Sequence, residues 1–205
     1  MISAGDHGER LIIHTNVITA SSSRLLKAAP SHVHDGRQRQ VKNIVVPNAE
    51  HSTLKSYLHW MYTDCILERE KAQHYGELFA LYLLGETLGD ALFCEKVVEA
   101  IVVIKDGFVW PPLQPDVSFV WERSSPNSPL RRVIREIWLT MPISSSVQAF
   151  KENPEAPYPT DFVLDLFSML AEQCKGAASS KFSSRTFEEL KVACIGFVKD
   201  AAVEE

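Results

Sequence analysis

The chain has few of the residues that break or crosslink structure, and it has no long apolar run. Nine glycines and eleven prolines among 205 residues are too few for a low-complexity protein. No uncharged apolar run approaches the roughly 18 residues that a membrane span requires, and the first ten residues lack the basic-then-apolar pattern of a signal peptide. We therefore expect a cytosolic or nuclear protein with no membrane partner.

Paired cysteines are also lacking. The four cysteines form no CxxC motif, and three of them lie in apolar helical patterns, which is typical of buried free thiols in a reducing compartment. A disulfide scaffold or a zinc site is therefore not expected. The residues are Cys65, Cys94, Cys174 and Cys194.

The chain has no excess of basic residues. It carries 21 lysines and arginines against 26 aspartates and glutamates, a formal net charge of −5. This charge provides no electrostatic reason to expect nucleic acid as a partner, and the absence of a zinc-finger pattern likewise disfavours a DNA-binding regulator. The remaining composition, with 45% hydrophobic and 23% charged residues, is that of an ordinary globular protein.

The most apolar part of the chain lies between residues 48 and 106, where three segments carry apolar residues at helical spacing. Such helices must be buried by one another and by the chain on either side. The apolar residues are Leu54, Tyr57, Leu58 and Met61 in the first segment, Leu78, Phe79, Leu81, Tyr82 and Leu83 in the second, and Phe93, Val97, Ile101 and Ile104 in the third.

Two short β-prone runs precede these helices, at residues 9–14 and 41–46, with two short helices predicted between them. Separate strands beside a run of helices indicate an α+β fold, helix-dominated, in which a small sheet is packed by a cluster of helices. The proline-rich stretch at 105–115 predicts a boundary. We expect a domain over 1–108 and a helical C-terminal extension over 109–205.

The extension is predicted to contain three long helices and a loop. Ser128 is a favourable N-cap with proline at the next position, and it opens the cleanest amphipathic stripe of the chain. Residues 142–159 are predicted to be loop because of their four prolines. The apolar residues are Leu130, Val133, Ile134, Ile137, Trp138 and Met141 in the first helix, Val163, Leu166, Phe167 and Leu170 in the second (160–172), and Phe187, Leu190, Cys194 and Phe197 in the third (185–199).

Five phrases, taken in order over roughly residues 10 to 172, resemble the BTB/POZ domain family and most closely its fungal branch. The family histidine corresponds to His14, and Trp60, Tyr62 and Thr63 match the family phrase for the helix that contains them. The phrases are LIIHTNVITASSSRLLKAA, YLHWMYTD, LYLLGETLGDALFCEKVVEAIV, FVWERSSPNSPLRRVIREIW and YPTDFVLDLFSML.

The resemblance implies a non-enzymatic protein-interaction module, an adaptor or scaffold that binds protein partners and needs no cofactor. The family commonly forms a swapped homodimer through a further N-terminal strand, and that strand is expected to be missing here. The alternative that the resemblance implies is a substrate adaptor of a cullin-RING ubiquitin ligase. Val33, His34 and Asp35 lie where such adaptors carry a hydrophobic-x-Glu motif for binding the cullin.

Two other candidate partner-binding regions follow from the residues. Trp60 and Tyr62 are aromatic anchors flanked by polar residues, the usual composition of an interface hot spot. Arg131 and Arg132, with Arg135, form a basic face on the helix after Ser128. This face is interpreted as a solvated surface with ion pairs to nearby glutamates, and the alternative is a docking surface for an acidic partner.

The hypothesis from another class, a small hydrolase or metal enzyme, has weak support, and no catalytic residue is predicted. His32 and His34 could bind a metal ion with His51 or Asp35, but histidines in a polar loop are far more often solvated. The pattern SxxK at residues 52–55 matches some acyl-transfer enzymes, but it lies at a predicted helix start where both residue types are common. Likewise, the glycines of GETLG at 85–89 form no phosphate loop, and GD at 89–90 is interpreted as a helix end followed by the cap of the next helix.

Overall fold

The computed structural model describes residues 2–4, 10–11, 13–14, 17, 44–46, 49–66, 74–107, 111–141, 143–152, 157–176 and 187–203. Apart from residue 17, the helices predicted within 15–29 lie outside the described residues, as does the loop containing Val33, His34 and Asp35. The chain divides into two compact units, one formed by 1–73 with 80–97 and the other by 74–79 with 98–205.

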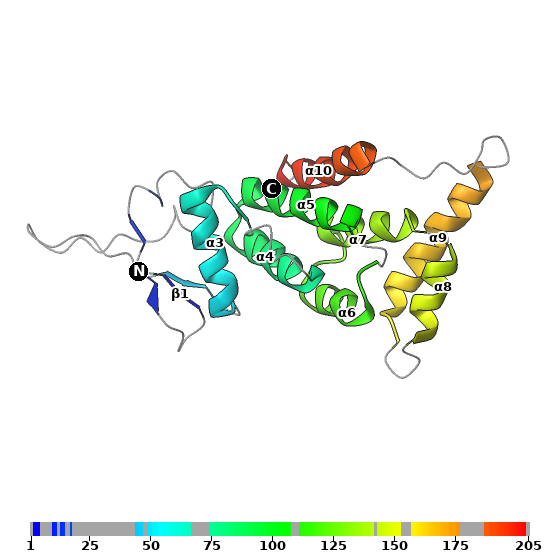
Figure 1. Ribbon diagram of the computed structural model, residues 1–205, viewed down its shortest axis with the longest axis horizontal. Coiled ribbons are helices and arrows are strands. Elements are labelled where there is room, and N and C mark those ends of the chain that lie inside the picture. Colours follow the sequence, from blue (N-terminus) through cyan, green and yellow to red (C-terminus); the bar gives the residue numbers. More distant parts are fainter. Residues whose placement is uncertain are drawn as a thin grey trace, which may run out of the picture. The chain divides into compact units, whose positions relative to one another are not determined.

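The described residues are dominated by α-helix, and the predicted α+β class is wrong (Figure 1). Among these residues, strand is confined to three segments of two or three residues, which are too short to form a layer on which helices could pack. The β-prone runs at 9–14 and 41–46 form strand only over Arg10–Leu11 and Ile44–Val46. The apolar helices therefore bury mainly one another.

The three strands belong to the first unit. β1 (Ile2–Ala4), which the sequence analysis did not predict, pairs antiparallel with β2 (Arg10–Leu11) and parallel with β3 (Ile44–Val46). Ile2 lies opposite Leu11 on one side and Ile44 on the other. α3 (His51–Thr63) contacts β1.

The core of the first unit confirms the predicted stripe of α3. Leu54, Tyr57 and Leu58 are buried, and Met61 is half-buried. Residues 80–88 of α4 (Tyr75–Leu88) and 91–97 of α5 (Ala91–Gly107) supply the rest of this core. The ring of Phe93 lies edge-on to that of Tyr57, with 4.7 Å between the ring centroids.

The turn between α4 and α5 confirms the prediction for Gly89 and Asp90. Gly89 adopts a φ of 61°, a left-handed conformation that glycine reaches without a Cβ clash. The Gly89 N–H donates to the Glu86 carbonyl and the Asp90 N–H to the Gly85 carbonyl, which together make a Schellman-type end for α4. The Asp90 carboxylate then accepts the Phe93 N–H at 3.1 Å and the Tyr57 hydroxyl at 2.8 Å, so the cap of α5 is tied to α3.

The second unit is arranged around α7, whose predicted stripe is confirmed. α7 contacts α6, α9 and α10, and its residues Leu130, Val133, Ile134, Ile137 and Trp138 are buried. Ser128 caps the helix as predicted, because its hydroxyl accepts the Leu130 N–H at 3.3 Å. The helices are α6 (Gln114–Arg123), α7 (Pro129–Leu139), α8 (Ile143–Glu152), α9 (Thr160–Gly176) and α10 (Phe187–Val203).

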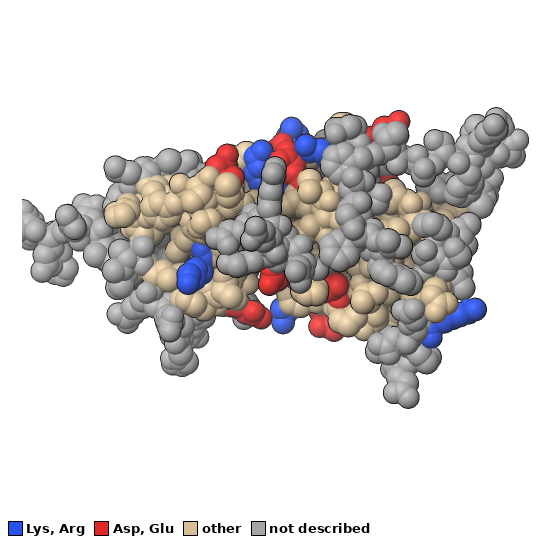
Figure 2. Space-filling model, viewed as in Figure 1, with Lys and Arg blue, Asp and Glu red and all other residues tan. Residues whose placement is uncertain are grey.

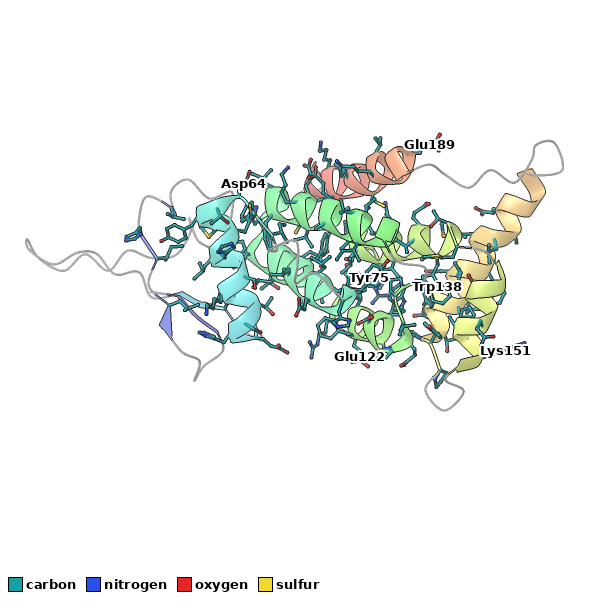
Figure 3. The ribbon with its side chains drawn as sticks, in the orientation of Figure 1. Asp64, Tyr75, Glu122, Trp138, Lys151 and Glu189 are labelled. Carbon is teal, nitrogen blue, oxygen red and sulfur yellow. The ribbon has the colours of Figure 1, made fainter. Side chains whose placement is uncertain are left out.

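The loop predicted over 142–159 contains a helix, α8, so that prediction is wrong. Pro142 and Pro154 lie just outside α8 at its two ends, where proline does not remove an intrahelical hydrogen bond. Phe150 of α8 also packs against two other aromatic rings of the second unit. The ring centroid of Phe150 is 5.2 Å from that of Trp138, which is labelled in Figure 3, and 4.9 Å from that of Tyr158.

Candidate protein-interaction surfaces

The two aromatic residues predicted as a partner-binding pair have different environments. Trp60 is only 6% exposed, and its ring centroid lies 4.8 Å from that of Phe93. Tyr62, two residues later on α3, is 49% exposed. A side chain buried in the core is unavailable to a partner until the helix moves, whereas Tyr62 presents its ring to solvent. Tyr62 is therefore the member of the pair that can contact a partner directly.

The exposed Tyr62 side chain is held by His14. The His14 backbone N–H donates to the Tyr62 hydroxyl at 3.1 Å, and the His14 Nδ1 lies 3.0 Å from the same oxygen. When Nδ1 carries no proton, the hydroxyl donates to it, so the phenol is both acceptor and donor. The two rings also meet edge-on, with 5.9 Å between their centroids. These contacts restrict the ring to one orientation at the surface.

The end of α3 beside Tyr62 is an ordered, exposed cap. Asp64 adopts a φ of 57°, and its N–H donates to the Trp60 carbonyl at 2.7 Å. The Thr63 hydroxyl donates to the His59 carbonyl at 2.8 Å and accepts the Cys65 N–H at 3.2 Å. Residues 62 to 65 are all exposed. We call residues 62–65 with His14 the α3-end surface.

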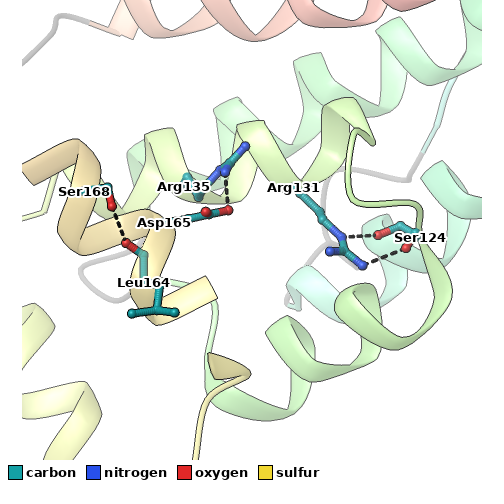
Figure 4. A network of polar contacts seen from close by, with 6 residues as sticks. All are labelled: Ser124, Arg131, Arg135, Leu164, Asp165 and Ser168. Carbon is teal, nitrogen blue, oxygen red and sulfur yellow. Dashed lines mark hydrogen bonds and ion pairs between the residues drawn. The ribbon is translucent and has the colours of Figure 1, made fainter. Parts of the chain in front are cut away.

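Arg131 and Arg132 were predicted to be part of one basic face, but their side chains lie in different environments. Arg132 is exposed, but Arg131 is only 7% exposed. The Arg131 guanidinium donates to the Trp121 carbonyl at 2.6 Å. It also donates to the carbonyl and hydroxyl oxygens of Ser124, at 2.7 and 2.9 Å (Figure 4). It also lies over the Trp121 ring, 4.9 Å from the centroid. Arg131 thus caps the C-terminal end of α6, where free carbonyls attract cations.

Arg135, the third member of that face, is half-buried and forms an ion pair with Asp165 of α9. Glutamates were the expected partners of these arginines, and Asp165 was not among the predicted residues. The contact joins α7 to α9 and pairs the charge of Asp165, whose side chain stays 48% exposed, with a cation. The ion pair therefore makes Asp165 less available to a partner of α9 than an unpaired aspartate would be.

An apolar surface on α9 was missed by the sequence analysis. Phe167 was predicted to be buried together with Val163, Leu166 and Leu170, but Phe167 and Leu164 are each 60% exposed. The opposite side of α9 is buried through Phe162 and Leu166, and the Phe162 ring lies 5.1 Å from that of Trp121. Because α9 carries apolar residues on both sides, apolar spacing alone did not show which side faces the core.

Exposed apolar side chains also occur on other elements. On the face drawn in Figure 2, the described lysine, arginine, aspartate and glutamate side chains are scattered, and most of the described surface is formed by other residues. The remaining large exposed apolar side chains include Leu92 of α5, Leu113, and Val192 of α10.

Burial shifts the pKa of two side chains that could in principle take part in chemistry, Cys94 and Asp116. Burial raises the pKa of the Cys94 thiol well above its ordinary value, and the negative charges of Glu86 and Asp90 raise it further. The thiol therefore stays protonated, which is the unreactive form. The pKa of the Asp116 carboxyl is also raised by burial, and this effect is partly offset by a hydrogen bond from the Leu113 backbone and by the charge of His74.

The residues considered for catalysis or metal binding do not form a site within the described ranges. Ser52 and Lys55 are exposed in the first turns of α3, and His51 is half-buried. His32, His34 and Asp35 lie outside the described residues. Within the described ranges, no group of three or more histidine, cysteine, aspartate or glutamate side chains is arranged to hold a metal ion.

The helices of the described segments include none that is both long enough and apolar enough to cross a membrane. The chain matches no model of a known protein family, no curated protein and no solved structure.

Proposed function

We propose that the chain is a non-enzymatic protein-interaction module, an adaptor or scaffold that acts in the cytosol or nucleus. The observation that carries this proposal is the α3-end surface, where Tyr62 is 49% exposed and yet held by two contacts with His14. Flexible tyrosines are common on protein surfaces. An exposed tyrosine held in one orientation is suited to fill a pocket on another protein.

The energetics of such an anchor favour binding. A tyrosine ring provides a large apolar area for burial, and tyrosine is enriched among the residues that dominate interface energies. Because His14 already restricts the ring, less side-chain entropy is lost when a partner covers it. The next two residues, Thr63 and Asp64, are exposed and polar, and polar residues normally form the rim around such an anchor.

The described buried ionisable groups support a structural rather than a catalytic role. Asp90 caps α5 and accepts the Tyr57 hydroxyl, and Arg131 caps α6. The thiol of Cys94 is kept protonated by burial. Each of these groups satisfies backbone or core contacts, so none of the three is positioned as a free acid, base or nucleophile.

The test is affinity capture of partners by the full chain and two variants. Tyr62→Ala removes the proposed anchor, and Leu92→Ala is the matched control because Leu92 is also 49% exposed in the same unit. Quantitative mass spectrometry of a source-cell extract should show proteins that wild type and Leu92→Ala retain and that Tyr62→Ala reduces at least tenfold. The leading protein is then purified, and its affinity for the three chains is measured by calorimetry.

Tyr62→Phe adds a second comparison, because it keeps the ring but removes the hydroxyl that contacts His14. An affinity between those of wild type and Tyr62→Ala would show that orienting the ring contributes to binding. The proposal fails if no captured protein depends on Tyr62 while all variants remain folded by circular dichroism.

Kinship with BTB/POZ proteins remains a proposal supported by the five sequence phrases, and so does the alternative role as an adaptor for a cullin ubiquitin ligase. Capture experiments test the latter directly. A cullin should be recovered by the wild-type chain and lost on Val33→Ala and on Asp35→Ala. Consistent absence of a cullin from the wild-type capture would exclude the adaptor role.

A further inference from the structure

The exposed side of α9 forms a second surface that the proposed function does not use. Leu164 and Phe167 are each 60% exposed, and the exposed Ala171 follows one turn after Phe167. These residues fall at positions i, i+3 and i+7 of a helix, so they form one continuous apolar stripe. Figure 4 shows the Leu164 side chain pointing away from the Arg135–Asp165 ion pair that joins α9 to α7.

The stripe can be covered without leaving a buried polar group unsatisfied. Ser168 is the polar residue beside Leu164 on this side, and its hydroxyl already donates to the Leu164 carbonyl at 2.9 Å (Figure 4). A buried hydroxyl costs little when its hydrogen bond is kept inside the helix. Asp165, on the neighbouring side of α9, is already paired with Arg135.

Two exposed acidic residues line one edge of the stripe. Asp161 and Glu172 are separated by eleven residues, or about three turns and 16 Å along the axis, so they lie on the same side of α9. Neither forms an ion pair with another described residue. The stripe is therefore apolar along its centre and negatively charged along one edge.

We propose that this side of α9 binds an amphipathic helix of a partner protein, with an apolar stripe and lysine or arginine residues along one edge. The spacing of Leu164, Phe167 and Ala171 matches the i, i+3, i+7 anchors by which helices pack against each other. Basic residues about three turns apart on the partner would meet Asp161 and Glu172.

The same charges disfavour a second copy of this chain as the occupant. A two-fold antiparallel pairing centred midway between Asp161 and Glu172 would place Asp161 of one copy against Glu172 of the other, twice. Like charges in such positions repel each other. An anionic membrane is disfavoured for the same reason, because helices that lie on such membranes carry basic residues beside the apolar side.

The probe is a fluorescein-labelled 18-residue model helix with leucines on one side and lysines along one edge. A matched peptide carries glutamate in place of each lysine. Fluorescence anisotropy with the full chain should show saturable binding of the lysine peptide at least tenfold tighter than that of the glutamate peptide. Raising the salt concentration should weaken the binding of the lysine peptide.

Variants of α9 locate the site. Leu164→Ser and Phe167→Ser should each weaken the binding of the lysine peptide at least tenfold. Val192→Ser, at a position 70% exposed on α10, should leave this binding unchanged. Asp161→Lys combined with Glu172→Lys should reverse the preference between the two peptides. Because all these positions are exposed, circular dichroism and thermal melting should show folded variants.

Three results would overturn the proposal. The first is binding that does not distinguish the peptides or the α9 variants. The second is a dimer in light scattering that Phe167→Ser makes monomeric, since the surface then pairs two copies. The third is binding to phospholipid vesicles that Phe167→Ser abolishes. Tyr62→Ala should leave peptide binding unchanged, so the outcome here is independent of the proposed function.

Discussion

At the scale of single residues, Arg131 and Arg132 are neighbours in sequence whose replacement is predicted to change stability by very different amounts. Arg131→Ala removes a buried guanidinium that satisfies oxygens of Trp121 and Ser124, so we expect unfolding to become easier by about 2–4 kcal/mol. Arg132→Ala, at the exposed neighbouring position, should change stability by no more than about 0.5 kcal/mol. Urea unfolding of the two variants measures the difference, and equal effects would contradict the capping role.

Asp116 gives a prediction about pH. Because burial raises the pKa of this carboxyl in the folded state, its ionisation opposes folding. The penalty is full above the folded-state pKa, falls as the pH drops through it, and is absent below the unfolded pKa, near 3.8. Asp116→Asn should therefore raise the urea midpoint at pH 7, with a gain that shrinks as the pH approaches 4.

The control for that measurement is Asp161→Asn. Asp161 also lies in the first turn of its helix, but it is exposed. Its replacement removes a favourable interaction with the helix dipole and relieves no burial, so no gain at pH 7 is expected. An Asp116→Asn variant that is less stable than wild type at pH 7 would show that the hydrogen bond from Leu113 outweighs the cost of burial.

At the scale of helices, two glycines in helix interiors should respond oppositely to alanine. A Cβ on Gly85 of α4 would lie 2.6 Å from the Cys94 sulfur and 2.9 Å from a ring carbon of Phe93. We expect Gly85→Ala to destabilise the fold by about 1–3 kcal/mol through overpacking. A Cβ on Gly196 of α10 would meet no atom within 4 Å, so Gly196→Ala should stabilise by about 0.5–1 kcal/mol.

A double-mutant cycle tests the cause of the Gly85 effect. Cys94→Ala removes the sulfur that the new methyl group would meet, although alone it leaves a cavity in the core. Combined with Gly85→Ala, it should cost clearly less than the sum of the two single changes. Strict additivity would show that the Cys94 sulfur is not what excludes a side chain at residue 85, and the Phe93 ring would be left as the obstacle.

The helices also show which features of the fold can be predicted from local sequence. The stripe of α7 and the turn at Gly89 and Asp90 were predicted, because helical period and cap chemistry are local properties. α8 was missed because its flanking prolines were interpreted as interruptions. The exposed position of Phe167 was missed because α9 has apolar residues on two sides. In such cases the core of the folded chain decides which side is buried.

At the scale of the whole molecule, the candidate surfaces depend on contacts that no local pattern contains. Tyr62 is oriented by His14, 48 residues earlier, and Trp60 is buried by Phe93. The helical period alone could not separate the roles of Trp60 and Tyr62, which the sequence analysis treated as one pair. The predicted α+β class was wrong for a related reason, since a β-prone run becomes a long strand only when partner strands are available along its length.

The α3-end surface and the α9 surface belong to different units of the chain. They also differ in chemistry, since one presents a single oriented phenol and the other an apolar stripe with an acidic edge. We therefore expect them to bind different partners. Proteins captured by the wild-type chain should divide into a set lost on Tyr62→Ala and a set lost on Phe167→Ser, with little overlap, and the double variant should lose both. If either single change removed all the partners, the two surfaces would serve one binding event, and the chain would be a single-site adaptor instead of a scaffold that joins two proteins.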